Sequence, residues 1–222
     1  MNIEEKAWSQ IFGVPFRRQT YLNMLYILFT FPLGTAYFIF LISGLLIGLS
    51  FSIILLGIPV LLLVFIAWWE LVAFERELAI HLLGVQIQPL SEKESADGGF
   101  WKEIKNKILN PVAWKGLAFL FIKFPLGIFS LIVSITLGGI SVIFFLTPLF
   151  YQSFTMGIMD LTVSSLPEAT FFSIVGVLLF VLTLHVINTM ATISGYLARV
   201  MLGGHKKGIS YQTVPDYHKI QE

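Results

Sequence analysis

The sequence contains no cysteine and little charge. Without cysteine, disulfide bonds, thiolate metal sites and a cysteine nucleophile are excluded. Charged residues make up 12% of the chain, whereas about 25% is usual in soluble domains. Hydrophobic residues make up 56%. This composition predicts an integral membrane protein that is surrounded by the lipid bilayer and has little mass outside it.

Motifs of common enzymes and of nucleotide-binding and metal-binding sites are missing as well. The sequence has no HExxH, no GxSxG and no phosphate-binding Gly-Lys-Ser/Thr loop. The four histidines are scattered, without paired ligands at helical spacing. The net charge is only +1, which argues against a nucleic-acid interface. We therefore expect no enzyme, no catalytic residue, no cofactor and no metal site.

Long apolar runs predict four membrane-spanning helices, because about 20 apolar residues cross a bilayer. We expect spans at about Tyr21–Gly44, Leu45–Trp69, Gly116–Gly139 and Ala169–Ile193. The third run stays apolar as far as Phe150, so its helix is either long and tilted or continues into an outer segment. No cleavable signal peptide is visible, and we expect the first span to act as its own insertion signal.

The positive charges predict how these spans are oriented. All 14 Lys and Arg lie in the N-terminal segment, in residues 76–123 or from residue 199 onward. Positive residues mark the cytoplasmic side, so both termini and the central loop are expected inside, in the cytoplasmic membrane. The outer connections carry only Asp160 and Glu168, which we expect to be solvated. The five tryptophans are expected in an interfacial belt at the inner boundary: Trp8, Trp68, Trp69, Trp101 and Trp114.

Two stretches near the starts of the first and third spans are alike. Residues 21–34 are YLNMLYILFTFPLG and residues 114–127 are WKGLAFLFIKFPLG, an offset of 93 residues. Because both hairpins are expected to start inside, the repeats are parallel and related by an axis along the membrane normal. We predict an all-α membrane protein whose four transmembrane helices form two parallel-repeat hairpins. The first repeat is residues 1–92, and residues 93–222 hold an interfacial helix, the second hairpin and a short tail.

Amphipathic helices are expected on the inner membrane surface. Residues 100–109 (FWKEIKNKIL) are basic, with apolar residues near helical spacing. Residues 74–84 and 195–203 each resemble a helical extension that ends at a glycine. In these extensions we expect the apolar side chains on the bilayer, and we expect the charged ones to face water, namely Glu75, Arg76 and Arg199.

Each FPLG motif places a proline and a glycine deep inside an apolar run. The favoured interpretation is structural: the proline kinks its helix and the glycine admits a neighbouring helix. The functional interpretation is a hinge that transmits motion between the two membrane faces. The hinge candidates are Pro32, Gly34, Pro59, Pro125 and Gly127, with Pro59 placed midway along the second span.

Polar groups inside spans are functional candidates by default. His185 and Asn188 are three residues apart and share a helix face. They fit an interhelical hydrogen bond or, as the less favoured alternative, a proton- or ligand-sensing site. Glu70 and Lys123 lie nearer the inner end of their spans, where we expect both to reach the lipid headgroups.

Two further patterns leave alternatives open. Gly44 and Gly48 have the GxxxG spacing, which fits either the contact of a homodimer or a tight hairpin. Glu70, Glu75 and His81 would lie at the inner surface, where they fit ordinary interfacial charges better than an enzyme acting on lipid.

Several of these motifs resemble one known family. The segments FPLGTAYFIFLISGLLIGLS, FERELAIHLLGVQI and NPVAWKGLAFLFIKFPLGIFS resemble the putative sensor domain of bacterial and archaeal membrane proteins, over roughly residues 15 to 203. The resemblance implies a four-span domain that is often fused to a histidine kinase. The chain ends about 20 residues after the last span, so we expect a stand-alone member. The resemblance assigns no ligand-binding residue.

We therefore expect a stand-alone membrane sensor or regulatory module. It would pass a helix shift, with the proline sites as hinges, to a separate cytoplasmic or membrane partner such as a signalling protein or a permease. The alternative is a small transporter or a transporter accessory subunit, for which parallel repeats and broken helices are also suitable.

Overall fold

The computed structural model describes residues 13–87, 108–151, 157–158, 161–163 and 165–203. In this part of the chain, four helices are long and apolar enough to cross a membrane: α2 (Arg18–Phe51), α3 (Gly57–Leu83), α5 (Pro111–Phe150) and α6 (Leu166–Leu202). The short elements are η1 (Val14–Phe16), η2 (Ser52–Ile54) and the antiparallel two-residue strands β1 (Gly157–Ile158) and β2 (Leu161–Thr162). The predicted all-α membrane fold with four spanning helices is confirmed.

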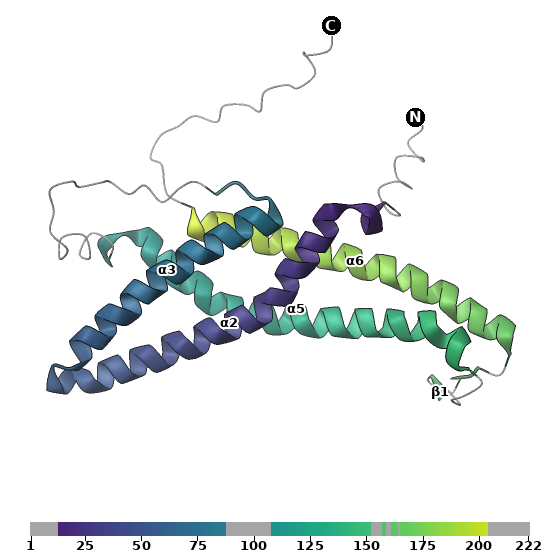
Figure 1. Ribbon diagram of the computed structural model, residues 1–222, viewed down its shortest axis with the longest axis horizontal. Coiled ribbons are helices and arrows are strands. Elements are labelled where there is room, and N and C mark those ends of the chain that lie inside the picture. Colours follow the sequence, from purple (N-terminus) through teal and green to yellow (C-terminus); the bar gives the residue numbers. More distant parts are fainter. Residues whose placement is uncertain (1–12, 88–107, 152–156, 159–160, 164, 204–222) are drawn as a thin grey trace, which may run out of the picture.

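The four helices form two hairpins that cross each other. In Figure 1, α2 and α3 run together toward one side of the molecule, while α5 and α6 run together toward the other. The hairpins meet where α2 crosses α5, and their turns lie far apart. We call the turns the hairpin tips. The opposite end, where α2 and α5 begin and α3 and α6 end, is called the basal end.

The helices are much longer than a bilayer is thick. The 40 residues of α5 and the 34 residues of α2 correspond to about 60 Å and about 50 Å at 1.5 Å per residue. The hydrocarbon core of a bilayer is about 30 Å thick. Of the two alternatives given for the third run, the structure has one continuous helix to Phe150, and tilting or bending is required to fit it into a membrane.

The first turn lies later in the chain than predicted. Helix α2 continues to Phe51 and α3 begins only at Gly57, so the predicted boundary at residues 44–45 is wrong. A Cβ at Gly57 would lie 2.1 Å from the backbone oxygen of Gly48, so only glycine fits this tight turn. Pro59 consequently lies in the first turn of α3, where proline is well tolerated. Its predicted place midway along a span was wrong.

The predicted glycine stops are found at both helix ends. Helix α3 ends at Gly84, whose φ of 64° is left-handed and whose N–H donates to the Ile80 carbonyl, as glycine after a helix often does. Helix α6 ends at Leu202, and Gly203 follows in an extended conformation. Both predicted extensions are continuous with their spanning helices. Of the predicted interfacial helix, residues 100–107 lie outside the described residues.

The tryptophans that are described do not form the predicted belt. Trp68 and Trp69 are buried in the main hydrophobic core, where they pack among residues of α2, α3 and α5. Trp114 is 56% exposed, and its ring lies 5.5 Å from that of Trp68. The crossing of the helices places Trp68 and Trp69 between helices rather than at the lipid surface, whereas Trp114 stays exposed. Trp8 and Trp101 lie outside the described residues.

Candidate functional site at the helix crossing

The two FPLG glycines lie at the contact between α2 and α5. A Cβ at Gly34 would lie 2.7 Å from the backbone oxygen of Lys123. A Cβ at Gly127 would lie 2.7 Å from the Cα of Phe31 and 2.8 Å from the oxygen of Thr30. Each glycine therefore touches the backbone just before the other motif, and the two contacts correspond at the 93-residue offset. Glycine is required because a side chain would separate the two backbones.

The motif prolines are interior residues of the same two helices. Pro32 lies inside α2 and Pro125 inside α5. Proline lacks the N–H that an interior helical residue donates, and kinks are concentrated at such positions. Both helices change direction along their length (Figure 1). The hinge interpretation of these residues stays a prediction.

A buried charge network fills the space beside this crossing. The Lys123 ammonium of α5 donates to Oε2 of Glu75 in α3. The hydroxyl of Tyr37 in α2 donates to Oε1 of the same carboxylate over 2.8 Å. Glu75 is 0% exposed and Lys123 is 2% exposed. One carboxylate thus joins three of the four spanning helices.

Two sequence predictions about this network were wrong. Glu75 was expected to face water and Lys123 to reach the headgroups, yet both are buried and paired. The physical reason is mutual neutralisation: each group satisfies the other in a place where an unpaired charge is costly. Arg199 is exposed as expected, and Arg76 is half-buried.

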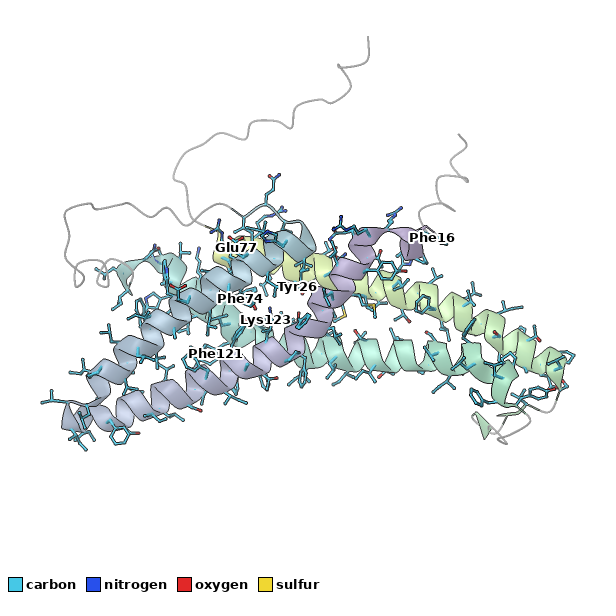
Figure 2. All side chains as sticks on the ribbon, in the orientation of Figure 1. Phe16, Tyr26, Phe74, Glu77, Phe121 and Lys123 are labelled. Atoms are coloured by element: carbon cyan, nitrogen blue, oxygen red, sulfur yellow. The ribbon has the colours of Figure 1, made fainter. Side chains whose placement is uncertain are left out.

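Aromatic rings complete the surroundings of the ammonium group. The Lys123 Nζ lies 4.9 Å from the centre of the Tyr26 ring and 6.0 Å from that of Tyr37. Both rings are buried, so their faces can stabilise the cation without competition from water. Lys123 and Tyr26 lie together at the crossing in Figure 2. The arrangement holds a fixed charge pair inside the helix bundle.

A second polar cluster joins α2 to α6 nearer the basal end. Asn23 Nδ2 donates to Asn188 Oδ1 over 2.9 Å, and Asn188 Nδ2 donates to the Thr20 hydroxyl over 3.2 Å. Gln19 Nε2 donates to Asn23 Oδ1 and to the Leu82 carbonyl at the end of α3, both over 2.9 Å. The cluster therefore connects the two hairpins.

The predicted partners His185 and Asn188 have separate contacts. His185 Nδ1 lies 2.9 Å from the Val181 carbonyl oxygen of its own helix, whereas Asn188 bonds across to α2. Of the two interpretations given for this pair, the interhelical hydrogen bond describes Asn188. Thr183, one turn earlier, lies 3.2 Å from the Ser141 hydroxyl of α5.

Gly44 and Gly48 face the other helix of their own hairpin. A Cβ at Gly44 would lie 2.6 Å from Val64, and one at Gly48 would lie 2.5 Å from Leu61. Both neighbours belong to α3. Of the two predicted uses of the GxxxG spacing, the tight hairpin is the one present in this structure.

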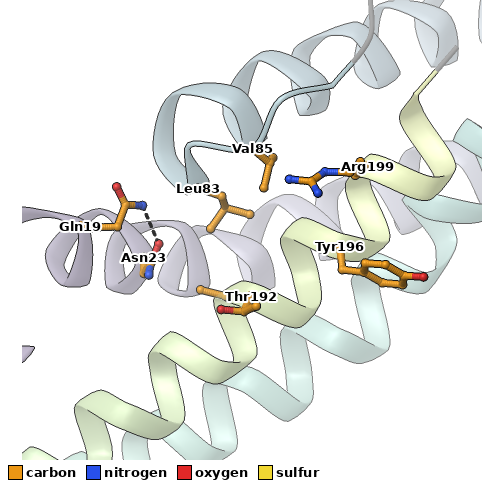
Figure 3. Close-up of a pocket in the computed structure, with 8 residues that line it drawn as sticks. Gln19, Asn23, Leu83, Val85, Thr192, Tyr196 and Arg199 are labelled. Atoms are coloured by element: carbon orange, nitrogen blue, oxygen red, sulfur yellow. Dashed lines mark hydrogen bonds between the residues drawn. The ribbon is translucent and has the colours of Figure 1, made fainter. Parts of the chain in front are cut away.

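A pocket of about 320 Å³ opens at the basal end. Helix α2 contributes Gln19 and Asn23, and the end of the first hairpin contributes Leu83 and Val85. Helix α6 contributes the remaining walls, which include Thr192, Tyr196 and Arg199. Figure 3 shows the Arg199 side chain extending toward Val85. This pocket could not be predicted from the sequence, because its walls come from segments that are far apart in the chain.

The surface acids that were considered for lipid chemistry are separated by the structure. Glu77 and His81 lie 3.6 Å apart on the exposed face of α3, while Glu75 points into the bundle. Among the described residues, no group of three or more His, Asp or Glu is placed to hold a metal ion. Glu168 is in the first turn of α6, and Asp160 lies outside the described residues.

Comparison with known proteins gives one match. The model of a protein family described as "Putative sensor" matches residues 26–202. This range contains both FPLG motifs, the Glu75–Lys123 pair and, of the polar cluster at the basal end, Leu82 and Asn188. No curated protein and no solved structure matches the chain.

Proposed function

Because this chain belongs to the Putative sensor family, we propose that it is a membrane sensor module whose two hairpins pivot about the α2–α5 crossing. A change at the membrane would alter the angle between the hairpins. The basal ends of α3 and α6 would then move, and a separate cytoplasmic or membrane partner would respond. Rigid-body rotation of packed units about a contact is a common form of such switching.

The observation that carries this proposal is the glycine contact between the hairpins. Gly34 and Gly127 let two helix backbones touch at the crossing, and the hairpins diverge from that point toward their tips (Figure 1). A close contact between backbones, with little side chain between them, permits rotation. The equivalence of the two contacts also supports the proposed internal repeat and its axis along the membrane normal.

The Glu75–Lys123–Tyr37 network supports a switch between defined arrangements. It links α2, α3 and α5 beside the pivot. Breaking a buried ion pair is costly, so intermediate positions that separate the two charges are disfavoured. The ion pair would keep the hairpins at one angle until a sufficient force acts on them.

The distribution of charge supports a cytoplasmic partner. We propose that both termini and the basal end face the cytoplasm, since every Lys and Arg is in the segments attached to that end. A signalling protein or a permease is the proposed partner. We do not propose a homodimer through Gly44 and Gly48, because both glycines pack against α3.

The transporter alternative has less support. A transport site would need free polar residues of both repeats inside the membrane, and those that meet, Glu75 with Lys123 and Asn23 with Asn188, are engaged with each other. His185 contacts its own helix backbone. We also propose that the chain has no catalytic role, because Glu75 is engaged with Lys123 rather than placed beside His81.

Distance measurements between spin labels test the pivot. The chain has no cysteine, so pairs of introduced cysteines can be labelled without background. One pair reports on the tips, Ile53→Cys with Leu149→Cys, and one reports on the basal end, His81→Cys with Val200→Cys. All four positions are at least half exposed. The protein would be measured in short-chain and in long-chain phosphatidylcholine bilayers.

We expect the tip distance and the basal distance to change together between the two bilayers. The matched control is the pair Ile53→Cys with Phe74→Cys, which lies within the first hairpin and should keep its distance. If the tip and basal distances stay constant in both bilayers, or if the control pair changes as much, the pivot mechanism is wrong.

A further inference from the structure

The basal pocket is a cavity that neither the crossing nor the pivot requires. It lies between α2, the segment after α3, and α6, and its volume is about 320 Å³, within the range of small-molecule sites. We propose that this pocket binds the phosphate headgroup of an anionic phospholipid from the membrane leaflet at the basal end.

The charge of the pocket fits a phosphate group. Of the described residues that line it, Arg199 is charged and the others are neutral. A guanidinium group binds phosphate oxygens through two parallel hydrogen bonds. The pocket also borders Gln19, in the first turn of α2, where the helix dipole favours negative charge. Within the described part of the chain, the residues lining the pocket include no carboxylate that would repel such a ligand.

The walls of the pocket are held in place by hydrogen bonds. Gln19 is bonded to Asn23 and to the Leu82 carbonyl, and Asn23 is bonded to Asn188. These contacts join α2 to the end of α3 and to α6. The pocket is therefore preformed, and a headgroup would lose little free energy in ordering it.

The surface beside the pocket favours a lipid over a free anion. Ile193, Tyr196 and Val200 recur at helical spacing on α6, and they are 57%, 69% and 51% exposed. Tyr196 also lines the pocket. Acyl chains could follow this apolar face while the headgroup contacts Arg199, and basic pockets between spanning helices commonly hold anionic headgroups. A soluble phosphate would gain nothing from that face.

This site is independent of the sensor role, since it needs neither a pivot nor a partner. It also has walls from both hairpins, so a bound headgroup would bridge them. Lipid binding can be measured directly, and the result of that measurement does not depend on whether the spin-label distances change.

Native mass spectrometry of the purified full chain tests the proposal. The protein is exchanged into detergent with equal amounts of phosphatidylglycerol and phosphatidylcholine, and retained lipid is counted. We expect preferential retention of phosphatidylglycerol, and about tenfold weaker retention for Arg199→Gln, because a hydrogen-bonded charge pair is lost. The matched control is Arg18→Gln, which removes one positive charge from the basal end outside the pocket and should retain the lipid.

A second variant keeps the charge and fills the space. Val85→Phe narrows the pocket while Arg199 remains, and it should also weaken retention of phosphatidylglycerol. Equal losses for Arg199→Gln and Arg18→Gln would mean that charge at the surface is responsible, and the proposal would fail. It would fail too if inorganic phosphate alone raised the melting temperature of the wild-type protein but not of Arg199→Gln, since the occupant would then be a free anion.

Discussion

The contact between Glu75 and Lys123 depends on the whole fold. They are 48 residues apart in the chain and belong to different hairpins, yet they share one buried contact with Tyr37. Such a pair adds little net stability compared with apolar residues, but removal of one partner leaves an unpaired buried charge. The pair therefore acts chiefly to fix how the hairpins meet.

We predict that Lys123→Met lowers the free energy of unfolding by about 3 kcal/mol or more, because Glu75 is left buried without its cation. The double variant Glu75→Gln, Lys123→Met should recover much of that loss, since neither charge remains. Unfolding in detergent micelles, arranged as a double-mutant cycle, measures the coupling. Additive losses from the two single changes would contradict the described contact.

At the scale of helices, the crossing of α2 and α5 depends on the absence of two side chains. We predict that Gly34→Ala and Gly127→Ala each destabilise the protein by about 1–3 kcal/mol, as overpacked contacts do. Each new Cβ would lie 2.7 Å from backbone atoms of the partner helix, and backbone cannot move aside as a side chain can.

Gly138→Ala is the matched control for these two changes. It lies in the same helix as Gly127, and a Cβ there would meet nothing within 4 Å. Replacing this glycine should be neutral or slightly stabilising, because alanine favours helix. A comparable loss of stability from Gly138→Ala would show that the close contact at the crossing does not cause the effect. Thermal unfolding in one detergent compares all three variants.

Apolar composition revealed the helices, but it could not place the first turn. Residues 49–57 are LSFSIILLG, with two serines and one glycine but none of the Pro, Asn or Asp residues that mark a turn most strongly. The chain reverses there through η2 and through Leu55 with a φ of 62°, a conformation unusual for leucine. The apolar residues of the turn keep hydropathy high through the reversal, so hydropathy gives no signal of it.

The candidate site was partly predictable from the same patterns. The repeated FPLG motif identified Gly34 and Gly127 as packing glycines, and both lie at the crossing. The buried pair was missed because each charge was judged alone and near the end of its own span. One signal was available: Lys123 shares a helix face with Gly116, Leu120 and Gly127, at spacings of seven, three and four residues. A lysine on a glycine-lined face is more consistent with burial than with snorkelling.

For the whole molecule, the proposed orientation is testable with single cysteines. Phe16 at the basal end is 89% exposed, and Ile53 at a hairpin tip is 91% exposed. We predict that a membrane-impermeant maleimide labels Ile53→Cys, and leaves Phe16→Cys unlabelled, when it is added to intact cells. Permeabilised cells supply the control, in which both positions should react. Labelling of Phe16→Cys from outside would reverse the proposed topology.

The division of one ion pair between two hairpins has a consequence for biogenesis. The ribosome delivers Glu75 with the first hairpin, and Lys123 emerges only with the second. A charged residue at the centre of a spanning helix costs about 3 kcal/mol on insertion scales, so neither half is well suited to lipid by itself. A nascent chain interrupted after the first hairpin would carry an acid without its base, and it would be a natural target for the proteases that clear orphaned membrane segments.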